Sequence, residues 1–557
     1  MDFRSLFRKK SATVSAHDEG DGHGHGLSKV LTVRDLTFFG VAAIIGGGTF
    51  SAIGNACFSG GPGVVLLYVI CAIACGFTAM CYAEFAARVP VSGSAYTYAY
   101  VSFGELFAWI IGWALLMEYS IGNIYIAFSW SGYFTNLLHG FGVDLPTWLT
   151  INYRAAQDAF TSTKIRTEGF SAWNSAPQLG GLRIIFDLPG VMINVLITWL
   201  VYVGTKESRN ISNIMVIIKL VVVILVIIVG FFYIDIDNWT PFLPNGFDGV
   251  MAGVSAVFFA FVGFDAVSTL AEEAKNPQRD LPRGMIYSLV ICTIVFILLA
   301  LVLTGMVSYK NLGVSDPLAE IFQLKGVKWM LYIVSVAAVV AMTSVMLVFQ
   351  MGQPRIWMTM SRDGLLPKKF SKIHPKYKTP GFATIVTGFV VGVPMFFTDE
   401  NFILDFTSIG TLFAFVLVCG GVLMLPSQKG TPEGEPTKGR FRLPYINAKY
   451  IFPGIISSTF TFLIIQFPTF FIETIFLKGE NYFQSIPMLC FFVICLVMTV
   501  LSFKKNLSLI PVLGLVSCCY LLTGMAVNNW KWFFIWFGIG LVVYFLYGHK
   551  HSRLAKK

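Results

Sequence analysis

Charged residues are scarce in this sequence. Asp, Glu, Lys and Arg together make up 13% of its 557 residues, against about 25% in an average globular chain. Hydrophobic residues make up 55%, and 52 residues are phenylalanine. A single water-soluble core stops growing at about 250–300 residues. The composition therefore excludes one large soluble domain and predicts a protein with many membrane-spanning segments.

The sequence also lacks the marks of a nucleic-acid-binding protein or an enzyme. The net charge is +10, but the cations are spread between apolar runs rather than gathered in a basic stripe on a polar domain. No nucleophile elbow, phosphate-binding loop or mid-span cluster of His, Asp and Glu is visible. We expect no nucleic-acid partner, no enzyme activity, no cofactor and no metal site, and the sequence indicates no protein partner. The segment HDEGDGHGHG (17–26) leaves metal binding as an alternative to a disordered tail.

Long apolar stretches account for the composition. Fourteen stretches of about 20 residues are separated by charged or Gly/Pro-rich segments, and an even number of spans leaves both termini on one side. With a cytoplasmic N-terminus, 30 of the 40 Lys and Arg fall on inner segments, nine on outer ones and one, Lys219, inside a span. The positive-inside rule then predicts a multi-pass protein of the plasma or inner membrane, with both termini cytoplasmic. The stretches are residues 36–57, 63–86, 106–134, 188–203, 212–233, 249–270, 285–307, 329–353, 382–397, 402–425, 451–476, 485–503, 509–526 and 530–547.

Two of these stretches contain residues that interrupt a helix. Residues 46–48 are three consecutive glycines in the middle of the first stretch, and each costs about 1 kcal/mol in a helix interior. Gly263 precedes Asp265 in the sixth stretch, although close helix packing through a small residue also explains Gly263. Because the breaks are five spans apart, they lie in segments of opposite orientation. This arrangement is typical of two inverted five-helix repeats.

Broken helices near the middle of a membrane can hold a zwitterion. The N-terminal end of a half-helix presents free N–H groups and the positive end of the helix dipole, which attract a carboxylate. Exposed carbonyls at the end of the other half attract an ammonium group. The breaks therefore predict an α-amino acid as the ligand.

Four segments of the sequence resemble a known family. These are CYAEFAARVPVSGSAYTYAYVSFGELFAWIIGWALLMEYS (81–120), FFAFVGFDAVSTLAEEAKNPQRDLPRG (258–284), MSRDGLLP (360–367) and LVVYFLYGHKHS (541–552). They closely resemble the cationic amino acid transporter family of the amino acid–polyamine–organocation superfamily. The resemblance implies an all-α polytopic membrane protein with a LeuT-like five-plus-five inverted-repeat fold and about fourteen transmembrane helices.

The resemblance also divides the chain. Residues 1–33 form a cytoplasmic tail, and residues 34–242 form the first repeat, with a long outer loop at 135–187. Residues 243–426 form the second repeat. Residues 427–557 add four spans and a short cytoplasmic C-terminus.

The resemblance assigns substrate contacts in the first span. The family motif usually reads IIGTG or IIGAG, and this chain has IIGGG, so Gly47 stands where the family has threonine. Carboxylate binding falls to the amides of Gly47 and Gly48, and the carbonyl of Ile44 faces the ammonium. Gly46 belongs to the same unwound segment. One hydroxyl contact of the family is lost at Gly47.

In the sixth span, the resemblance places the carbonyls that bind the amine on Phe259, Ala260 and Val262. Phe264 matches the aromatic residue that closes over the substrate as an outer gate. A phenylalanine in a Phe-rich helix also has an ordinary alternative, because such residues usually face lipid or the core.

Three further residues complete the predicted site. Lys219 lies about seven residues into the fifth span, or roughly 10 Å along the helix. It either extends back to the inner surface or, as the resemblance implies, occupies the place of a bound sodium ion and holds carbonyls near Ile44 and Gly46. Burial favours the neutral form of a lysine, so its proton can couple to transport. The resemblance places Glu118 beside the pocket for the substrate side chain, where it meets a cationic substrate or an internal polar group. Met346 either lines that pocket or fills the core.

The expected function is secondary active transport of an amino acid by alternating access, with proton symport. An exchanger, a uniporter and a nutrient sensor with little net flux are the alternatives. The sequence does not separate cationic from small neutral substrates, because Glu118 fits both.

Overall fold

The computed structural model describes residues 6–9, 31–88, 94–161, 168–204, 209–270, 274–314, 316–377, 379–425, 441–466 and 482–555. Regular structure in this part of the chain is helical apart from one hairpin of two short strands, β1 (Gln178–Leu179) and β2 (Leu182–Arg183). The predicted all-α class is therefore confirmed. The His-rich segment 17–26, for which metal binding was an alternative, lies outside the described residues.

The helices follow the predicted stretches. Those of the first half are α2 (Val33–Ile44), η2 (Gly48–Ala52), α3 (Ile53–Gly60), α4 (Val64–Arg88), α5 (Ser94–Ser102), α6 (Glu105–Gly140), α7 (Tyr153–Thr161), α8 (Glu168–Ser175), α9 (Leu188–Val203), α10 (Arg209–Phe231), α11 (Gly246–Ala252), α12 (Val254–Phe261) and η6 (Phe264–Leu270). Those of the second half are α13 (Pro277–Met306), α14 (Pro317–Leu324), α15 (Lys328–Arg362), α16 (Gly381–Gly392), α17 (Glu400–Met424), α18 (Ala448–Gln466), α20 (Tyr482–Lys505), α21 (Leu509–Thr523), α22 (Val527–Val543), η10 (Tyr544–Gly548) and α23 (His549–His551).

Each of the fourteen predicted stretches overlaps a helix, and residues 467–476 of the eleventh lie outside the described residues. Within the part of the chain that the structure describes, seven helices are long and apolar enough to cross a membrane, and α11 with α12, bent by 43°, form an eighth candidate. Four shorter apolar helices lie in the predicted spans at 188–203, 212–233, 382–397 and 509–526. The fold is that of a multi-pass membrane protein, and the count of fourteen crossings stays a prediction.

Side-chain caps fix where several helices begin. At α2, Thr32 accepts a hydrogen bond from the Asp35 amide and Asp35 accepts one from the Thr32 amide, which is a capping box. Asp187 caps α9 through the Gly190 amide, and Asp399 caps α17 through the Phe402 amide, both at 2.9 Å. These caps supply acceptors for amides that have no partner inside their own helix.

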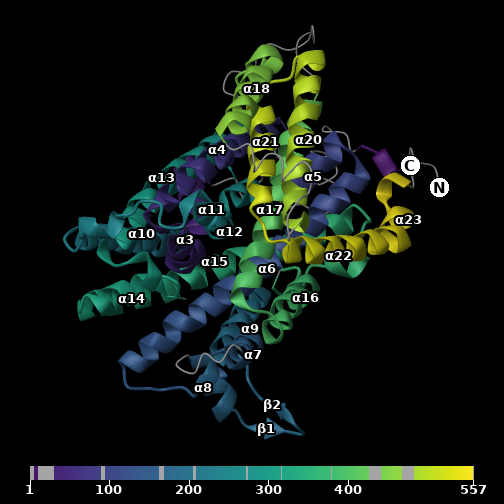
Figure 1. Ribbon diagram of the computed structural model, residues 1–557. Coiled ribbons are helices and arrows are strands. Elements are labelled where there is room, and N and C mark those ends of the chain that lie inside the picture. Colours follow the sequence, from purple (N-terminus) through teal and green to yellow (C-terminus); the bar gives the residue numbers. More distant parts are fainter. Residues whose placement is uncertain are drawn as a thin grey trace.

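The helix α6 forms the centre of the molecule and is buried along most of its length (Figure 1). It packs against α15 and α17. Amide side chains also connect its neighbours: Gln350 donates to Asn194 at 2.7 Å, and Asn194 donates to the Gly388 carbonyl at 3.1 Å. These bonds join α15, α9 and α16 into one block.

Peripheral elements extend from this centre. The hairpin with α7 and α8 lies at one end of the molecule, and α18 and α20 project from the other (Figure 1).

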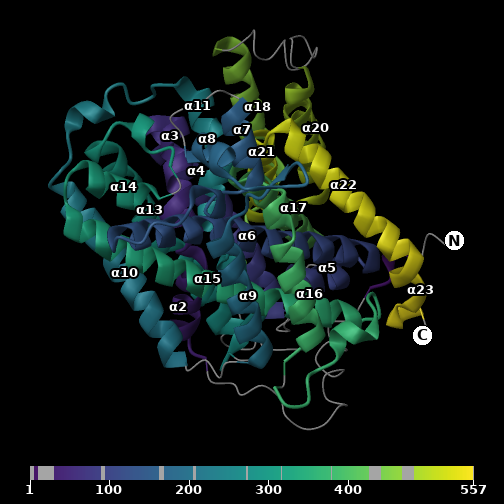
Figure 2. The same ribbon diagram turned by 90° about the horizontal axis from the view of Figure 1, so that it is seen from below.

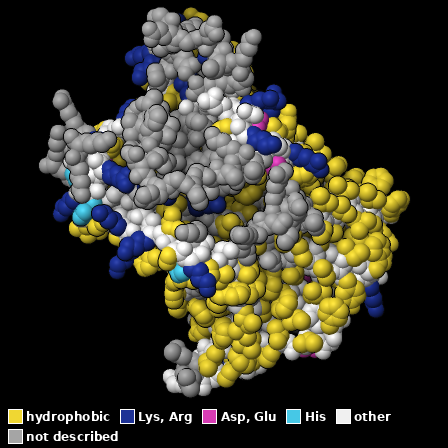
Figure 3. Space-filling view, turned by 180° about the vertical axis from the view of Figure 1, so that it is seen from behind, with side chains coloured by type: hydrophobic (Ala, Val, Ile, Leu, Met, Phe, Trp, Pro, Cys, Tyr) yellow, Lys and Arg dark blue, Asp and Glu magenta, His cyan; other side chains and the backbone are white. Residues whose placement is uncertain are grey.

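Hydrophobic side chains cover a broad area of the surface in Figure 3. On α10, for example, Val221, Ile224 and Ile228 are exposed. An apolar exterior over intact helices is the arrangement that a lipid bilayer requires.

Candidate functional site

The first predicted span is broken at its glycines. Helix α2 ends at Ile44, and Ile45 is extended, with φ −79° and ψ 98°. The carbonyl of Gly46 accepts the amides of Thr49 and Phe50, both at 3.0 Å. A second half-helix, η2 continued by α3, therefore starts with Gly47 at its N-terminal cap.

The sixth predicted span is broken as well. Helix α12 ends at Phe261, Val262 is extended with ψ 134°, and Gly263 has φ +116°. Few residues other than glycine adopt that backbone conformation. The short helix η6 then begins at Phe264. A further bend, which the sequence did not predict, lies at Gly253 between α11 and α12.

The two breaks contact each other reciprocally. A Cβ atom built on Gly48 would lie 2.9 Å from the Ala260 Cβ and would overlap the Ala260 Cα. A Cβ atom built on Gly263 would lie 3.0 Å from the carbonyl carbon of Ala43. Each break thus packs against the half-helix of the other span, and glycine at both positions permits the close approach.

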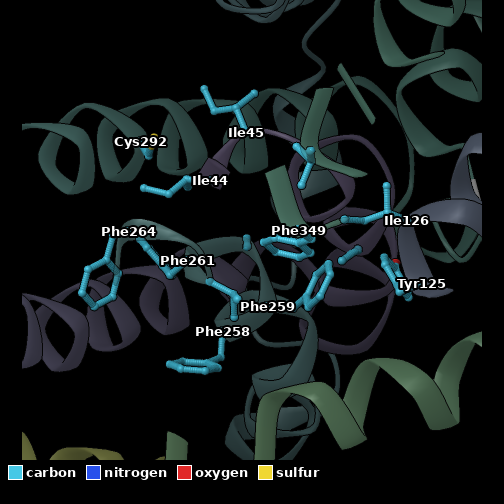
Figure 4. Close-up of a cluster of buried hydrophobic side chains, with 14 of the residues drawn as sticks. Ile44, Ile45, Tyr125, Ile126, Phe258, Phe259, Phe261, Phe264, Cys292 and Phe349 are labelled. Atoms are coloured by element: carbon cyan, nitrogen blue, oxygen red, sulfur yellow. The ribbon is translucent and has the colours of Figure 1, made fainter. Parts of the chain in front are cut away.

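Aromatic side chains fill the space beside the breaks (Figure 4). The rings of Tyr125 and Phe259 lie edge to face, with their centroids 4.7 Å apart. Tyr125 and Ile126 of α6 also flank Gly47, at 3.4 and 3.1 Å from its built Cβ. Phe349 of α15 packs against Gly122 of α6. The immediate surroundings of the first break are therefore mainly apolar.

Lys219 reaches the first break from α10. Its side chain is fully buried, and Nζ donates to the carbonyls of Ala42 at 2.8 Å and Ile45 at 2.9 Å. The prediction was of carbonyls near Ile44 and Gly46, and Ile45 lies between these two residues. Cys292 of α13 lies next to the ammonium group. The side chain bridges two spans, and it does not extend back to the surface.

Glu118 lies on α6 beside the second break. Its side chain is 3% exposed, and the Thr411 hydroxyl and the Asp265 carboxyl group lie near it. Glu118 Oε2 and Asp265 Oδ2 are both buried without a hydrogen-bond partner. Two acidic groups with unsatisfied oxygens therefore lie just past Gly263.

The remaining predicted residues are also buried. Phe264 packs its ring against Tyr82 at 5.9 Å and Phe415 at 5.1 Å. Its role as an outer gate stays a prediction. Met346 of α15 is fully buried, one residue after Val345, which packs against Gly46.

Comparisons with known proteins show the family of this chain. A family model described as amino acid permease matches residues 31–486, and a model for the C-terminus of such permeases matches residues 507–552. The chain belongs to the amino acid permease family. The resemblance to cationic amino acid transporters is confirmed.

Several transporters are similar to this permease over most or all of its length. The permease is 36% identical to a branched-chain amino acid permease of Bacillus subtilis, over 99% of each chain. It is 34% identical to a methylthioribose transporter of the same organism, over 99% of this chain and all of that one. A vacuolar cationic amino acid transporter of Arabidopsis thaliana is 36% identical over 76% of this chain and 63% of its own. These relatives are permeases and transporters, so the expectation that the chain is not an enzyme is confirmed.

The permease also has a polar cluster near the first break that the sequence reasoning missed. Ser51 lies 3.2 Å from the Tyr125 hydroxyl and donates to Glu400 at 3.3 Å. Ser129 donates to the same Glu400 oxygen at 3.5 Å, and it comes from α6. The Tyr133 hydroxyl donates to the Phe50 carbonyl at 2.6 Å. Glu400 begins α17, so three spans meet here.

Proposed function

We propose that this permease transports an amino acid by alternating access and holds its substrate at the two breaks. The observation that carries the proposal is the reciprocal contact between Gly48 and Ala260 and between Gly263 and Ala43. Helix ends that meet inside an apolar protein leave backbone groups for a ligand to satisfy. The names of the relatives support an amino acid as that ligand.

The backbone at each break suits one charge of the substrate. Gly47 and Gly48 open the second half of the first span, where the first-turn amides have no partner inside the helix. We assign the substrate carboxylate to these amides. The carbonyls of Ile44, Phe259, Ala260 and Val262 would accept the ammonium group. Val262 is extended, so its carbonyl leaves the helical pattern.

The two repeats would be residues 34–242 and 243–426, which place one break in each. Alternating access would then move the broken spans against the block formed by α6, α9, α15 and α16. The excess of Lys and Arg on the predicted inner segments supports cytoplasmic termini in a plasma or inner membrane.

Proton coupling would act through Lys219. Its two hydrogen bonds to the first span are strengthened when the amine carries a charge. Release of the proton would weaken the hold on the carbonyls of Ala42 and Ile45. The broken span would then be freer to move in one protonation state than in the other.

A neutral amino acid is the favoured substrate class. Tyr125, Phe259 and Phe349 surround the first break with apolar surface, which fits the branched-chain permease among the relatives. A cationic substrate is the second candidate, because Glu118 Oε2 is buried and unpartnered. Met346 would limit the size of either side chain.

Uptake of a labelled amino-acid panel into proteoliposomes tests the function. We expect leucine, isoleucine or valine to accumulate when an inward proton gradient is imposed, with no response to a sodium gradient. Counterflow without accumulation would indicate an exchanger or uniporter. Saturable binding without flux would indicate a sensor, and no binding of any of the twenty amino acids would contradict the proposal.

Glu118→Gln separates the two substrate classes. If the substrate is neutral, we expect leucine uptake to fall less than about threefold, because the glutamine keeps the size and polar atoms of the side chain. If the substrate is cationic, loss of a buried charge pair costs about 3–5 kcal/mol, so arginine uptake should fall more than about 100-fold. Glu320→Gln on α14, where the side chain is partly exposed, is the matched control. A large loss of leucine uptake would contradict the neutral assignment.

A further inference from the structure

Glu105, the first residue of α6, gathers hydroxyl groups from three segments. It is fully buried, and its carboxylate accepts hydrogen bonds from Tyr100 at 3.2 Å, Tyr544 at 3.0 Å and Ser552 at 2.5 Å. Tyr100 belongs to α5, Tyr544 begins η10, and Ser552 follows α23. A carboxylate is an acceptor only, so three donors suit it well. One buried acid therefore ties the C-terminal segment to α5.

Both ends of the chain meet at this point. The Glu105 amide donates to the Arg8 carbonyl at 2.9 Å. Gly104, with φ +107°, approaches the Phe7 backbone so closely that a built Cβ would lie 2.7 Å from its carbonyl carbon. Segment 6–9 and the C-terminal helices lie together at the same end of the molecule in Figures 1 and 2.

The C-terminal segment also packs closely against a second glycine. Gly364, with φ +85°, lies so close to the His551 carbonyl that a side chain would overlap it. The Arg553 amide donates to the neighbouring Asp363 carbonyl at 3.0 Å, and the Tyr96 hydroxyl of α5 donates to the Asp363 carboxylate at 2.8 Å. The C-terminal segment thus contacts the end of α15, and Asp363 there is also bonded to α5.

Aromatic rings connect α5 to the sixth-span break. Tyr98 of α5 stacks on Phe85 at 4.9 Å and meets Tyr82 edge to face at 6.2 Å. Tyr82 in turn contacts Phe264, the first residue past Gly263, at 5.9 Å. Helix α5 therefore lies between the C-terminal segment and the proposed substrate site.

Tyr96 and Tyr100 of α5 remain hydrogen-bond donors. Burial, with the nearby carboxylates of Glu105 and Asp363 adding to it, raises the pKa of Tyr100 above its usual value. Burial and the Asp363 carboxylate likewise raise the pKa of Tyr96. Both phenols keep their protons at any physiological pH, so these contacts do not depend on pH through the tyrosines.

We propose that the C-terminal segment Tyr544–Leu554 is a latch that holds α5 closed over the substrate pathway. The proposal rests on the proposed function, since it assigns α5 to one of the two gates of the carrier. Opening on this side requires α5 to move, and Tyr100 must then leave the Glu105 carboxylate, which Tyr544 and Ser552 hold in place. A transporter with this latch weakened should open more readily on the α5 side.

Thiol accessibility of α5 tests the latch without reference to transport. Thr97 of α5 is 3% exposed, and Thr97→Cys provides a reporter for a membrane-impermeant thiol reagent in purified full-length protein. Adding Tyr544→Phe and Ser552→Ala removes two hydroxyls and preserves the packing. We expect the labelling rate of the reporter to rise at least about 10-fold, after subtraction of the protein without the reporter.

Tyr547→Phe is the matched control, because this tyrosine lies on the same segment and stacks on His551 rather than bonding to Glu105. It should leave the labelling rate unchanged. Ser552→Ala alone replaces the double variant if that variant does not elute as a folded protein. Equal labelling of latch variant and control would overturn the proposal, even if the melting temperature falls. Absence of amino-acid uptake in the wild-type protein as well as in the variants, with the labelling difference intact, would instead count against the proposed function.

Discussion

Lys219→Ala is expected to remove the pH dependence of uptake and to lower its rate by about 10- to 100-fold. The substitution leaves the carbonyls of Ala42 and Ile45 buried without the donor that now lies within 2.9 Å of each. An unsatisfied buried backbone group costs about 1–3 kcal/mol, and about 1.4 kcal/mol corresponds to a factor of ten in rate. The titrating amine that would carry the coupling is lost as well.

Initial uptake rates in proteoliposomes, measured between about pH 5 and 8, check this expectation. The companion variant Lys219→Met keeps an apolar chain of similar length, so it separates loss of volume from loss of the ammonium group. Lys372→Ala, on an exposed residue of the loop after α15, should retain the wild-type profile. An unchanged pH profile in both Lys219 variants would exclude this lysine as the coupling group.

The family resemblance anticipated the contact of Lys219 with the first span, but it did not specify which carbonyls accept the hydrogen bonds. Helix α2 ends at Ile44, so the carbonyls of its last turn lack amides four residues further on. The Ile45 amide takes the Val41 carbonyl, which leaves Ala42 free for the lysine. The last residue of the helix decides which carbonyls have no amide partner. The run of glycines does not by itself specify that last residue.

The breaks could be predicted from the sequence because glycine weakens a helix through its own backbone, whatever surrounds it. Three consecutive glycines weaken a helix wherever they occur, and the first span breaks at residues 45–47. Gly253 was not predicted as a bend, since a lone glycine in an apolar run is also compatible with close packing. The residues that surround it in three dimensions decide between these two outcomes.

Residues whose hydrogen-bond partners lie far away in the sequence could not be recognised from the sequence alone. Glu400 contacts Ser51, which is 349 positions away, and Glu105 contacts Ser552 across 447 positions. In the sequence, both acids stand at the edge of an apolar stretch, where a charged residue ordinarily faces water. Only the packing of α17 and α23 against the centre of the fold shows that these two carboxylates receive hydroxyl groups from other spans.

Gly48→Ala is expected to abolish transport, with uptake falling at least about 100-fold. The added methyl group would overlap the Ala260 Cα and lie 3.0 Å from the Ala260 amide nitrogen. These are backbone atoms of α12, so no side-chain rotation relieves the contact, and the two broken spans must separate. Overpacking of this kind costs about 1–3 kcal/mol, and here it also displaces the backbone groups proposed to bind the substrate.

Two other glycines provide the controls for this experiment. A Cβ on Gly76 of α4 meets nothing within 4 Å, so Gly76→Ala should transport normally. A Cβ on Gly47 meets only side chains, the nearest being Ile126 at 3.1 Å. Gly47→Ala should therefore lose much less activity than Gly48→Ala, which fits a family motif with threonine or alanine at that position. Substrate binding to the purified variants, compared with their melting temperatures, distinguishes a damaged site from an unfolded protein. Wild-type uptake by Gly48→Ala would show that transport does not require the breaks to touch.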